Sequence, residues 1–120
     1  YEQQIHAGKA TARPDIRVVR ERGAVMVIDA GAGFGQVPGM MAVDGVIERA
    51  RNLGLGAASV RNSNHYGAAG IYARRIADAG LVGITTSSVW RPAIVPTGGK
   101  APKLGTNPIA FAAPRKGGRG

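Results

Sequence analysis

The sequence predicts an α/β fold in which helices flank a mixed sheet. Short β-rich stretches alternate with segments whose apolar residues recur every three or four positions, the spacing of one helix face. Glycine contributes 19 of the 120 residues and marks the ends of many of these segments. Hydrophobic residues make up 44% of the chain, which excludes a disordered protein. A chain of this length can bury roughly 65% of its unfolded surface, enough for one modest core.

Five segments are predicted to be strands, because each carries β-branched or apolar residues between turn signals. They are residues 16–20, 24–29, 57–61, 81–86 and 108–113. The first two flank the turn signal Arg22-Gly23 and are expected to form a hairpin. The second is apolar enough to be a central strand.

Three segments are predicted to be helical, residues 1–7, 38–53 and 68–79. Each is followed by a glycine suited to a helix C-terminus, and Pro38 suits the first turn of the long helix. In the last helix Ile71 or Tyr72 is expected to face inward together with Ile76. Residues 87–105 are predicted to form a long loop, and loops of this length in compact domains are commonly functional or disordered.

The charge is strongly positive and unevenly distributed. Sixteen Lys and Arg oppose seven Asp and Glu, which gives a net charge of +9. Every charged residue after Asp78 is basic: Arg91, Lys100, Lys103, Arg115, Lys116 and Arg119. This pattern is typical of a solvated surface, a nucleic-acid surface or a surface that meets a small anion. Aromatic residues, on which bases would stack, are only 5% of the chain.

Composition excludes several other kinds of site. The chain has no cysteine, so it has no disulfide, thiolate metal site or cysteine nucleophile. We expect no metal, because one histidine without a nearby carboxylate does not make a site. No apolar run approaches the roughly 20 residues of a membrane helix, and no signal peptide opens the chain. The sequence therefore predicts a cytoplasmic protein with no membrane partner.

The glycine-rich loops do not match the standard phosphate-binding motifs. Residues 31–35 (Gly-Ala-Gly-Phe-Gly) lie between a strand and a helix, but Gln36 stands where a dinucleotide fingerprint needs its third glycine. Gly98-Gly99-Lys100 lacks the upstream glycine and the following Ser or Thr of a P-loop. These glycines are expected to form tight turns and helix caps.

The polar loop at residues 62–67 is the most informative segment. It connects a strand to a helix N-terminus, where free N–H groups favour anions. His65 follows the strand, and a near-neutral imidazole can exchange a proton with a hydroxyl or carbonyl group. The alternatives are a structural histidine, asparagines that cap the helix, and small residues that only pack it. Thr106 and Asn107 similarly suit either ligand contact or a turn.

Three runs in this order resemble the malate/L-lactate dehydrogenase family. They are residues 63–70 (SNHYGAAG), 96–99 (PTGG) and 104–114 (LGTNPIAFAAP). The resemblance covers nearly the whole chain. It implies a non-Rossmann NAD(P)-binding fold and hydride transfer between NAD or NADP and a 2-hydroxy acid or 2-oxo acid.

The resemblance also implies roles for individual residues. His65 would be the catalytic proton-transfer residue, and Thr106 would contact the substrate. The residues lining the cofactor would be His65, Tyr66, Gly67, Ala68 and Ala69. Family chains are more than twice this length and form homodimers, so residues 1–120 are expected to be a central, partial domain of a two-domain protein, truncated at both ends and inactive alone. Nucleic acid is not an expected partner. The alternative interpretation is a basic module that binds nucleic acid or a partner protein without catalysis.

Overall fold

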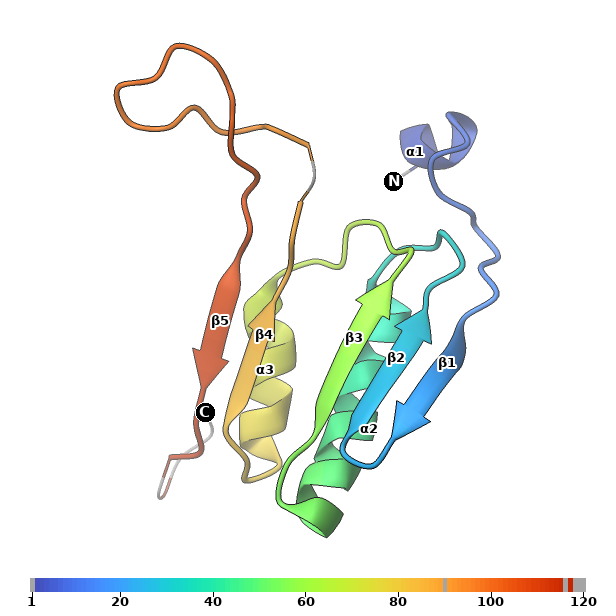
Figure 1. Ribbon diagram of the computed structural model, residues 1–120, viewed down its shortest axis with the longest axis vertical. Coiled ribbons are helices and arrows are strands. Elements are labelled where there is room, and N and C mark those ends of the chain that lie inside the picture. The colour runs from blue at the N-terminus through green and yellow to red at the C-terminus, as the bar shows by residue number, and fades with distance from the viewer. Residues whose placement is uncertain (1, 90, 116, 118–120) are drawn as a thin grey trace. The chain divides into compact units, whose positions relative to one another are not determined.

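The computed structural model, which describes residues 2–89, 91–115 and 117, has the predicted α/β class (Figure 1). Its elements are α1 (Glu2–His6), β1 (Arg17–Arg22), β2 (Val25–Asp29), α2 (Gln36–Leu53), β3 (Ala57–Arg61), α3 (Ala69–Asp78), β4 (Gly83–Thr86) and β5 (Ile109–Ala112). They fall into two compact units, unit 1 (Tyr1–Ala68) and unit 2 (Ala69–Gly120). The described strands form two sheets, one in each unit, where the sequence predicted one mixed sheet.

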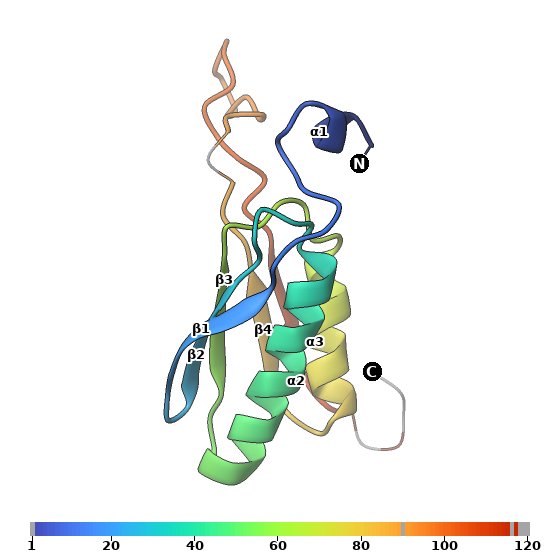
Figure 2. The same cartoon turned by 90° about the vertical axis from the view of Figure 1, so that its right-hand side faces the viewer.

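Unit 1 contains a three-stranded mixed sheet in the order β1-β2-β3. Strands β1 and β2 are antiparallel, which confirms the predicted hairpin, and β2 is central as expected. Strand β3 runs parallel to β2, with α2 as the connection that covers one face of the sheet (Figure 2). The core lies between them, where Ile28 has no exposed surface and Val43 of α2 is 4% exposed.

Two glycines explain how α2 ends and how β3 begins against it. Gly54 adopts a left-handed backbone with φ of 80°, and its N–H donates to the carbonyl of Ala50. A Cβ at Gly56 would lie 2.9 Å from the carbonyl carbon of Val46. The chain can therefore turn back along α2 only because Gly56 has no side chain.

Unit 2 contains α3 and the antiparallel pair β4–β5. Tyr72, Ala73, Ile76 and Ala77 of α3 are buried, so Tyr72, and not Ile71, is the inward residue at the start of this helix. A Cβ at Gly83 would lie 2.7 Å from the carbonyl oxygen of Ala73, so this glycine lets β4 approach the helix closely. Alternate residues of the strand pair, Ile84, Ile109 and Phe111, are exposed.

The long loop between β4 and β5 folds back on itself. Backbone hydrogen bonds between Ile94 and Leu104 close it into a hairpin-like arm, drawn in orange in Figure 1. The Asn107 side-chain oxygen accepts the Val89 N–H at 2.8 Å and holds the base of the arm. Trp90 in this arm lies outside the described residues, as do Tyr1, Lys116 and Arg119. No helix among the described residues is long and apolar enough to cross a membrane.

Candidate functional site

The candidate site begins where the parallel strands β2 and β3 end, at the same edge of the sheet (Figure 1). The register pairs their last residues, Asp29 and Arg61. The Asp29 carboxylate accepts hydrogen bonds from the Gly31 N–H at 2.9 Å, the Asn62 side chain at 3.1 Å and Arg61 Nε at 3.0 Å. These donors favour the ionised form, so the Gly31 N–H first, then Asn62 and Arg61, lower the pKa of Asp29.

The two loops that leave these strands are joined by a ladder of backbone hydrogen bonds. The Ala32 N–H donates to the Asn62 carbonyl at 2.9 Å, and the Asn64 N–H donates back to the Gly33 carbonyl at 2.9 Å. The Gly35 N–H then donates to the His65 carbonyl at 3.0 Å. The loop that carries His65 is thus held along its length by residues 30–35.

Asn64 adds a side-chain tie to the same loops. Its amide nitrogen donates to the carbonyls of Ala32 at 2.9 Å and Lys9 at 3.2 Å. The Ala32 carbonyl also accepts the N–H of Thr11 at 3.1 Å, so a third segment joins the assembly. The amide of Asn64 therefore serves the loop scaffold, where the sequence left open a helix cap or a ligand contact.

Close packing explains the glycines at positions 31, 33 and 35. Gly31 has a left-handed backbone, as expected for a turn, and a Cβ there would lie 2.7 Å from the Asp15 carbonyl oxygen. A Cβ at Gly33 would lie 2.6 Å from the ring of Pro14. A Cβ at Gly35 would collide with the Cβ of Tyr66 and lie 2.9 Å from Ser63 Oγ. Gly33 and Gly35 thus permit loop contacts, where the sequence suggested turns and caps.

His65 is exposed, on a backbone that the ladder holds in place. Tyr66, which follows it, is half-buried. Gly67 has a left-handed backbone with open space around its missing Cβ, and Ala68 is exposed. Gly67 and Ala68, which follow Tyr66 in unit 1, therefore present backbone without bulky side chains.

Two predicted site residues belong to unit 2. The side chain of Ala69 is buried at the start of α3, so this residue could offer a ligand only its backbone. Thr106 is exposed in the arm, between Gly105 and Asn107. A Cβ at Gly105 would lie 2.6 Å from the Val89 carbonyl oxygen, so the chain beside Thr106 is closely packed.

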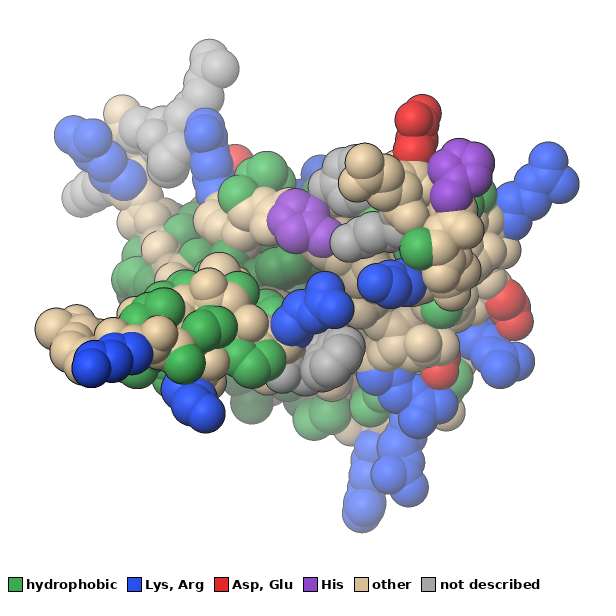
Figure 3. Space-filling model, turned by 90° about the horizontal axis from the view of Figure 1, so that it is seen from above, with side chains coloured by type: hydrophobic (Ala, Val, Ile, Leu, Met, Phe, Trp, Pro, Cys, Tyr) green, Lys and Arg blue, Asp and Glu red, His purple; other side chains and the backbone are tan. Residues whose placement is uncertain are grey.

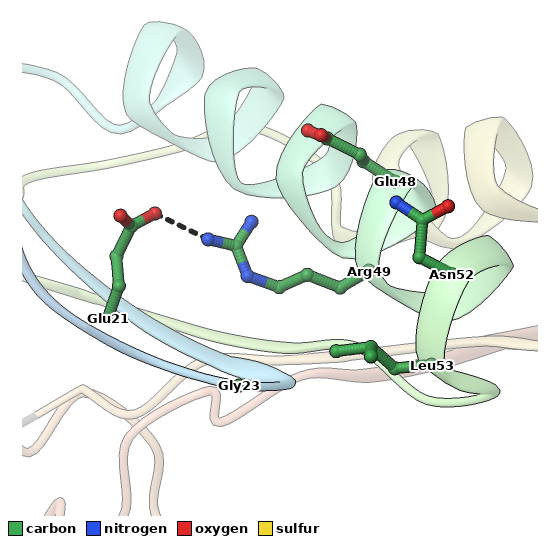
Figure 4. Close-up of a pocket in the computed structure, with 6 residues that line it drawn as sticks. All are labelled: Glu21, Gly23, Glu48, Arg49, Asn52 and Leu53. Carbon is green, nitrogen blue, oxygen red and sulfur yellow. Dashed lines mark hydrogen bonds and ion pairs between the residues drawn. The ribbon is translucent and has the colours of Figure 1, made fainter.

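A pocket of about 380 Å³ lies at the other end of the unit 1 sheet (Figure 4). Its walls come from the β1–β2 turn and the last turns of α2, and they include Glu21, Glu48 and Arg49. Arg49 forms an ion pair with Glu21 and donates to the Gly45 carbonyl at 3.0 Å, so it braces the hairpin against α2. This pocket contains none of the predicted site residues.

The charged residues that the structure describes do not form a dedicated metal centre. No three His, Asp or Glu side chains among them gather as a metal-ligand set. Lys and Arg side chains project from the surface in Figure 3, and several of them lie next to one another at its lower edge. Arg91, Lys100, Lys103 and Arg115 are all exposed.

Comparison with known proteins places this chain in a family. A family model described as malate/L-lactate dehydrogenase matches residues 1–120. The chain belongs to the malate/L-lactate dehydrogenase family. This finding confirms the resemblance seen in the sequence and places the chain among proteins whose named members include hydroxyacid dehydrogenases.

The curated relatives of this chain are named as several kinds of dehydrogenase. This chain is 47% identical over 117 residues to a malate dehydrogenase of Pyrococcus abyssi, and the match covers 98% of this chain and 32% of that protein. It is 42% identical to an L-sulfolactate dehydrogenase of Methanocaldococcus jannaschii, and this match covers 93% of this chain and 32% of that protein. A (2R)-3-sulfolactate dehydrogenase (NADP(+)) of Chromohalobacter salexigens is 41% identical, and this match covers 98% of this chain and 34% of that protein.

Solved structures show the same fold. The malate dehydrogenase from Pyrococcus horikoshii OT3 gives a TM-score of 0.81 at 47% identity and covers 93% of this chain and 32% of its own. The malate dehydrogenase from Entamoeba histolytica gives a TM-score of 0.84 at 36% identity, and the match covers 95% of this chain and 31% of that one. The chain spans about a third of the length of these relatives.

The part that Asp29 plays in holding the loops was not predicted from the sequence. A local signal for it exists, since Asp29 ends an apolar strand and Gly31 follows two residues later. Aspartate side chains commonly accept a hydrogen bond from the backbone two residues further on. The bonds to Arg61 and Asn62 have no such local signal, because they depend on how β2 pairs with β3.

Proposed function

We propose that this chain supplies the histidine-bearing segment of an NAD(P)-dependent oxidoreductase acting on 2-hydroxy acids and 2-oxo acids. The observation that carries the proposal is the exposed His65 on a braced loop in a chain of this family. The loop follows the carboxyl ends of parallel strands, where ligand sites of α/β proteins gather. The names of the relatives, malate and sulfolactate dehydrogenases, support the substrate class.

Gly67 and Ala68 leave room for a nicotinamide cofactor beside the backbone. Gly67 has open space where a Cβ would be, and Ala68 has a small, exposed side chain. A ligand can therefore approach this backbone closely. We assign His65, Tyr66, Gly67, Ala68 and Ala69 to the cofactor site, Ala69 through its backbone. NAD or NADP would supply the hydride chemistry, and an NADP(+)-dependent relative supports a nicotinamide cofactor.

His65 would handle the proton of the reaction. Oxidation of a 2-hydroxy acid releases the hydroxyl proton, and a neutral imidazole can accept it. In the reverse direction the imidazolium returns that proton to the carbonyl oxygen of the 2-oxo acid. Thr106 would hold the substrate through its exposed hydroxyl group.

The net charge of the chain suits anionic ligands. Hydroxy acids are carboxylates and the dinucleotide carries phosphates, so a charge of +9 favours their approach. Aromatic residues make up only 5% of the chain, so few side chains are available to stack on the bases of a nucleic acid. We therefore place the basic-module interpretation second.

The activity, on this proposal, belongs to a longer protein of which these 120 residues are a part. The relatives are about three times as long as this chain, so we expect the polypeptide alone to be inactive. By family resemblance we also propose a cytoplasmic homodimer.

The test is a steady-state assay of the full-length protein with malate, sulfolactate and lactate as substrates, each with NAD and with NADP. We expect cofactor reduction with at least one pair, and none from the 120-residue polypeptide. Failure of the full-length protein with every pair, in both reaction directions, would contradict the proposed activity.

A further inference from the structure

We propose that Asp29 and Asn64 are positioning residues, which hold the His65 backbone where proton transfer requires it. This inference rests on the proposed function of His65. Neither side chain needs to touch substrate or cofactor, because both act through the loop that carries the histidine. The hydrogen bonds of the two side chains lead to this assignment.

Asp29 joins the start of one loop to the start of the other. Its Oδ1 atom accepts from the Gly31 N–H in the loop after β2 and from the Asn62 side chain in the loop after β3. Its Oδ2 atom accepts from Arg61 Nε, the last residue of β3. The Asp29 side chain is 15% exposed, whereas that of its partner Arg61 is 63% exposed. One carboxylate thus fixes how both loops leave the sheet.

Asn64 joins the same loops immediately before His65. Its side-chain nitrogen donates to Ala32 and Lys9, and its backbone N–H donates to Gly33. The next rung of the ladder is the bond from the Gly35 N–H to the His65 carbonyl. The residue before the histidine and the histidine's own carbonyl are both attached to the loop at residues 30–35.

Such bracing matters for an exposed catalytic histidine. Proton transfer needs the imidazole within roughly 2.6–3.2 Å of the reacting group. A displacement of about 1 Å can cost on the order of 100-fold in rate. The backbone position of His65, which the bond from the Gly35 N–H restrains, sets the region that the imidazole can reach. Loss of the bonds at Asp29 or Asn64 should therefore act on catalysis more than on substrate binding.

The experiment compares variants of the full-length protein at saturating cofactor. We expect Asp29→Ala and Asn64→Ala to lower kcat by about 10- to 100-fold and to change KM for the hydroxy acid by less than about threefold. Asp29→Asn keeps a side-chain oxygen for Gly31 and Asn62, so it should lose less than Asp29→Ala. Asn64→Asp keeps the size of the side chain but turns an oxygen toward the Ala32 carbonyl, so it should behave like Asn64→Ala.

Two controls separate positioning from general loss of stability. Val43→Ala weakens the core of unit 1 at a distance from the loops, and Asp78→Asn removes a carboxylate from an exposed pair with Arg74 in unit 2. We expect kcat within about twofold of wild type for both. Hydrogen exchange gives a second readout, in which Asp29→Ala and Asn64→Ala raise exchange at the Gly35 amide by about tenfold and leave the β1–β2 amides unchanged.

The outcomes distinguish this inference from the proposed function. If His65→Ala lowers kcat but Asp29→Ala and Asn64→Ala do not, or if they lower it no more than Val43→Ala, the positioning role is wrong. If either alanine variant fails to fold, Asp29→Asn and Asn64→Asp decide the question by the same two readouts. If His65→Ala itself leaves kcat unchanged, the proposed function of His65 fails instead.

Discussion

Asp29 should make the stability of unit 1 depend on pH in the acidic range. Its partners Gly31, Asn62 and Arg61 lower its pKa below the usual 3.8, so the unfolded chain binds the proton more tightly than the folded one. The stabilisation is therefore complete above the usual value and is lost as the pH falls through the folded value. We expect the free energy of unfolding to fall more steeply below pH 3.8 in wild type than in Asp29→Asn. Urea titrations at several pH values in this range measure the free energy of unfolding. The same pH dependence in wild type and Asp29→Asn would contradict the prediction.

Gly35 offers a second test at a single residue. A Cβ there would collide with Tyr66 and crowd Ser63, so Gly35→Ala should destabilise unit 1 by about 1–3 kcal/mol. Gly70 is the matched control, because it lies in α3 with nothing within 4 Å of its missing Cβ. Gly70→Ala should stabilise the chain by about 0.5–1 kcal/mol through helix propensity. Chemical denaturation measures the unfolding free energies of both variants. Equal changes in Gly35→Ala and Gly70→Ala would show that the packing around Gly35 is looser than described.

Some of these residues could be placed from the sequence alone and others could not. The position of His65 in the polar loop after a strand was predictable, because apolar alternation ends at Arg61 and polar residues follow. The hydrogen bonds that hold the loop could not be predicted from the sequence, because Asp29 and Asn62 are 33 residues apart and meet only through strand register. The role of His65 in proton transfer stays a prediction of the family resemblance.

At the scale of elements, β2 should contribute most to the stability of unit 1. Ile28 has no exposed surface, so Ile28→Ala should cost about 2–5 kcal/mol and Ile28→Val about 0.5–1.5 kcal/mol. Val25 lies in the same strand with 50% of its surface exposed, and Val25→Ala should cost clearly less than Ile28→Ala. Unfolding free energies of the three variants give the order, and a Val25→Ala effect as large as that of Ile28→Ala would contradict it.

The elements themselves were largely predictable, whereas their assembly was not. Strands and helices follow from local patterns and glycine caps, and the β1–β2 hairpin follows from the short turn at Gly23. The pairing of β4 with β5 crosses the arm at residues 87–108, and no local pattern encodes it. The division of the strands into two sheets likewise depends on contacts between distant segments.

At the scale of the whole molecule, family membership is the property that the sequence predicted best. Three runs in a fixed order indicated the malate/L-lactate dehydrogenase family, and the match over residues 1–120 confirms it. Composition alone supported a broader set of interpretations, because a charge of +9 suits any anionic partner. Ordered motifs decided between these interpretations because they specify chemistry at particular residues.

In the proposed function, we claim that His65 carries the proton in hydride transfer between NAD(P) and a hydroxy acid. The most direct test of this claim is the turnover number of the full-length protein with His65→Ala, beside His6→Ala as the matched histidine control in α1. We predict a loss of about 100-fold or more for His65→Ala and turnover within about twofold of wild type for His6→Ala. Unchanged turnover of His65→Ala on the best substrate would contradict the claim.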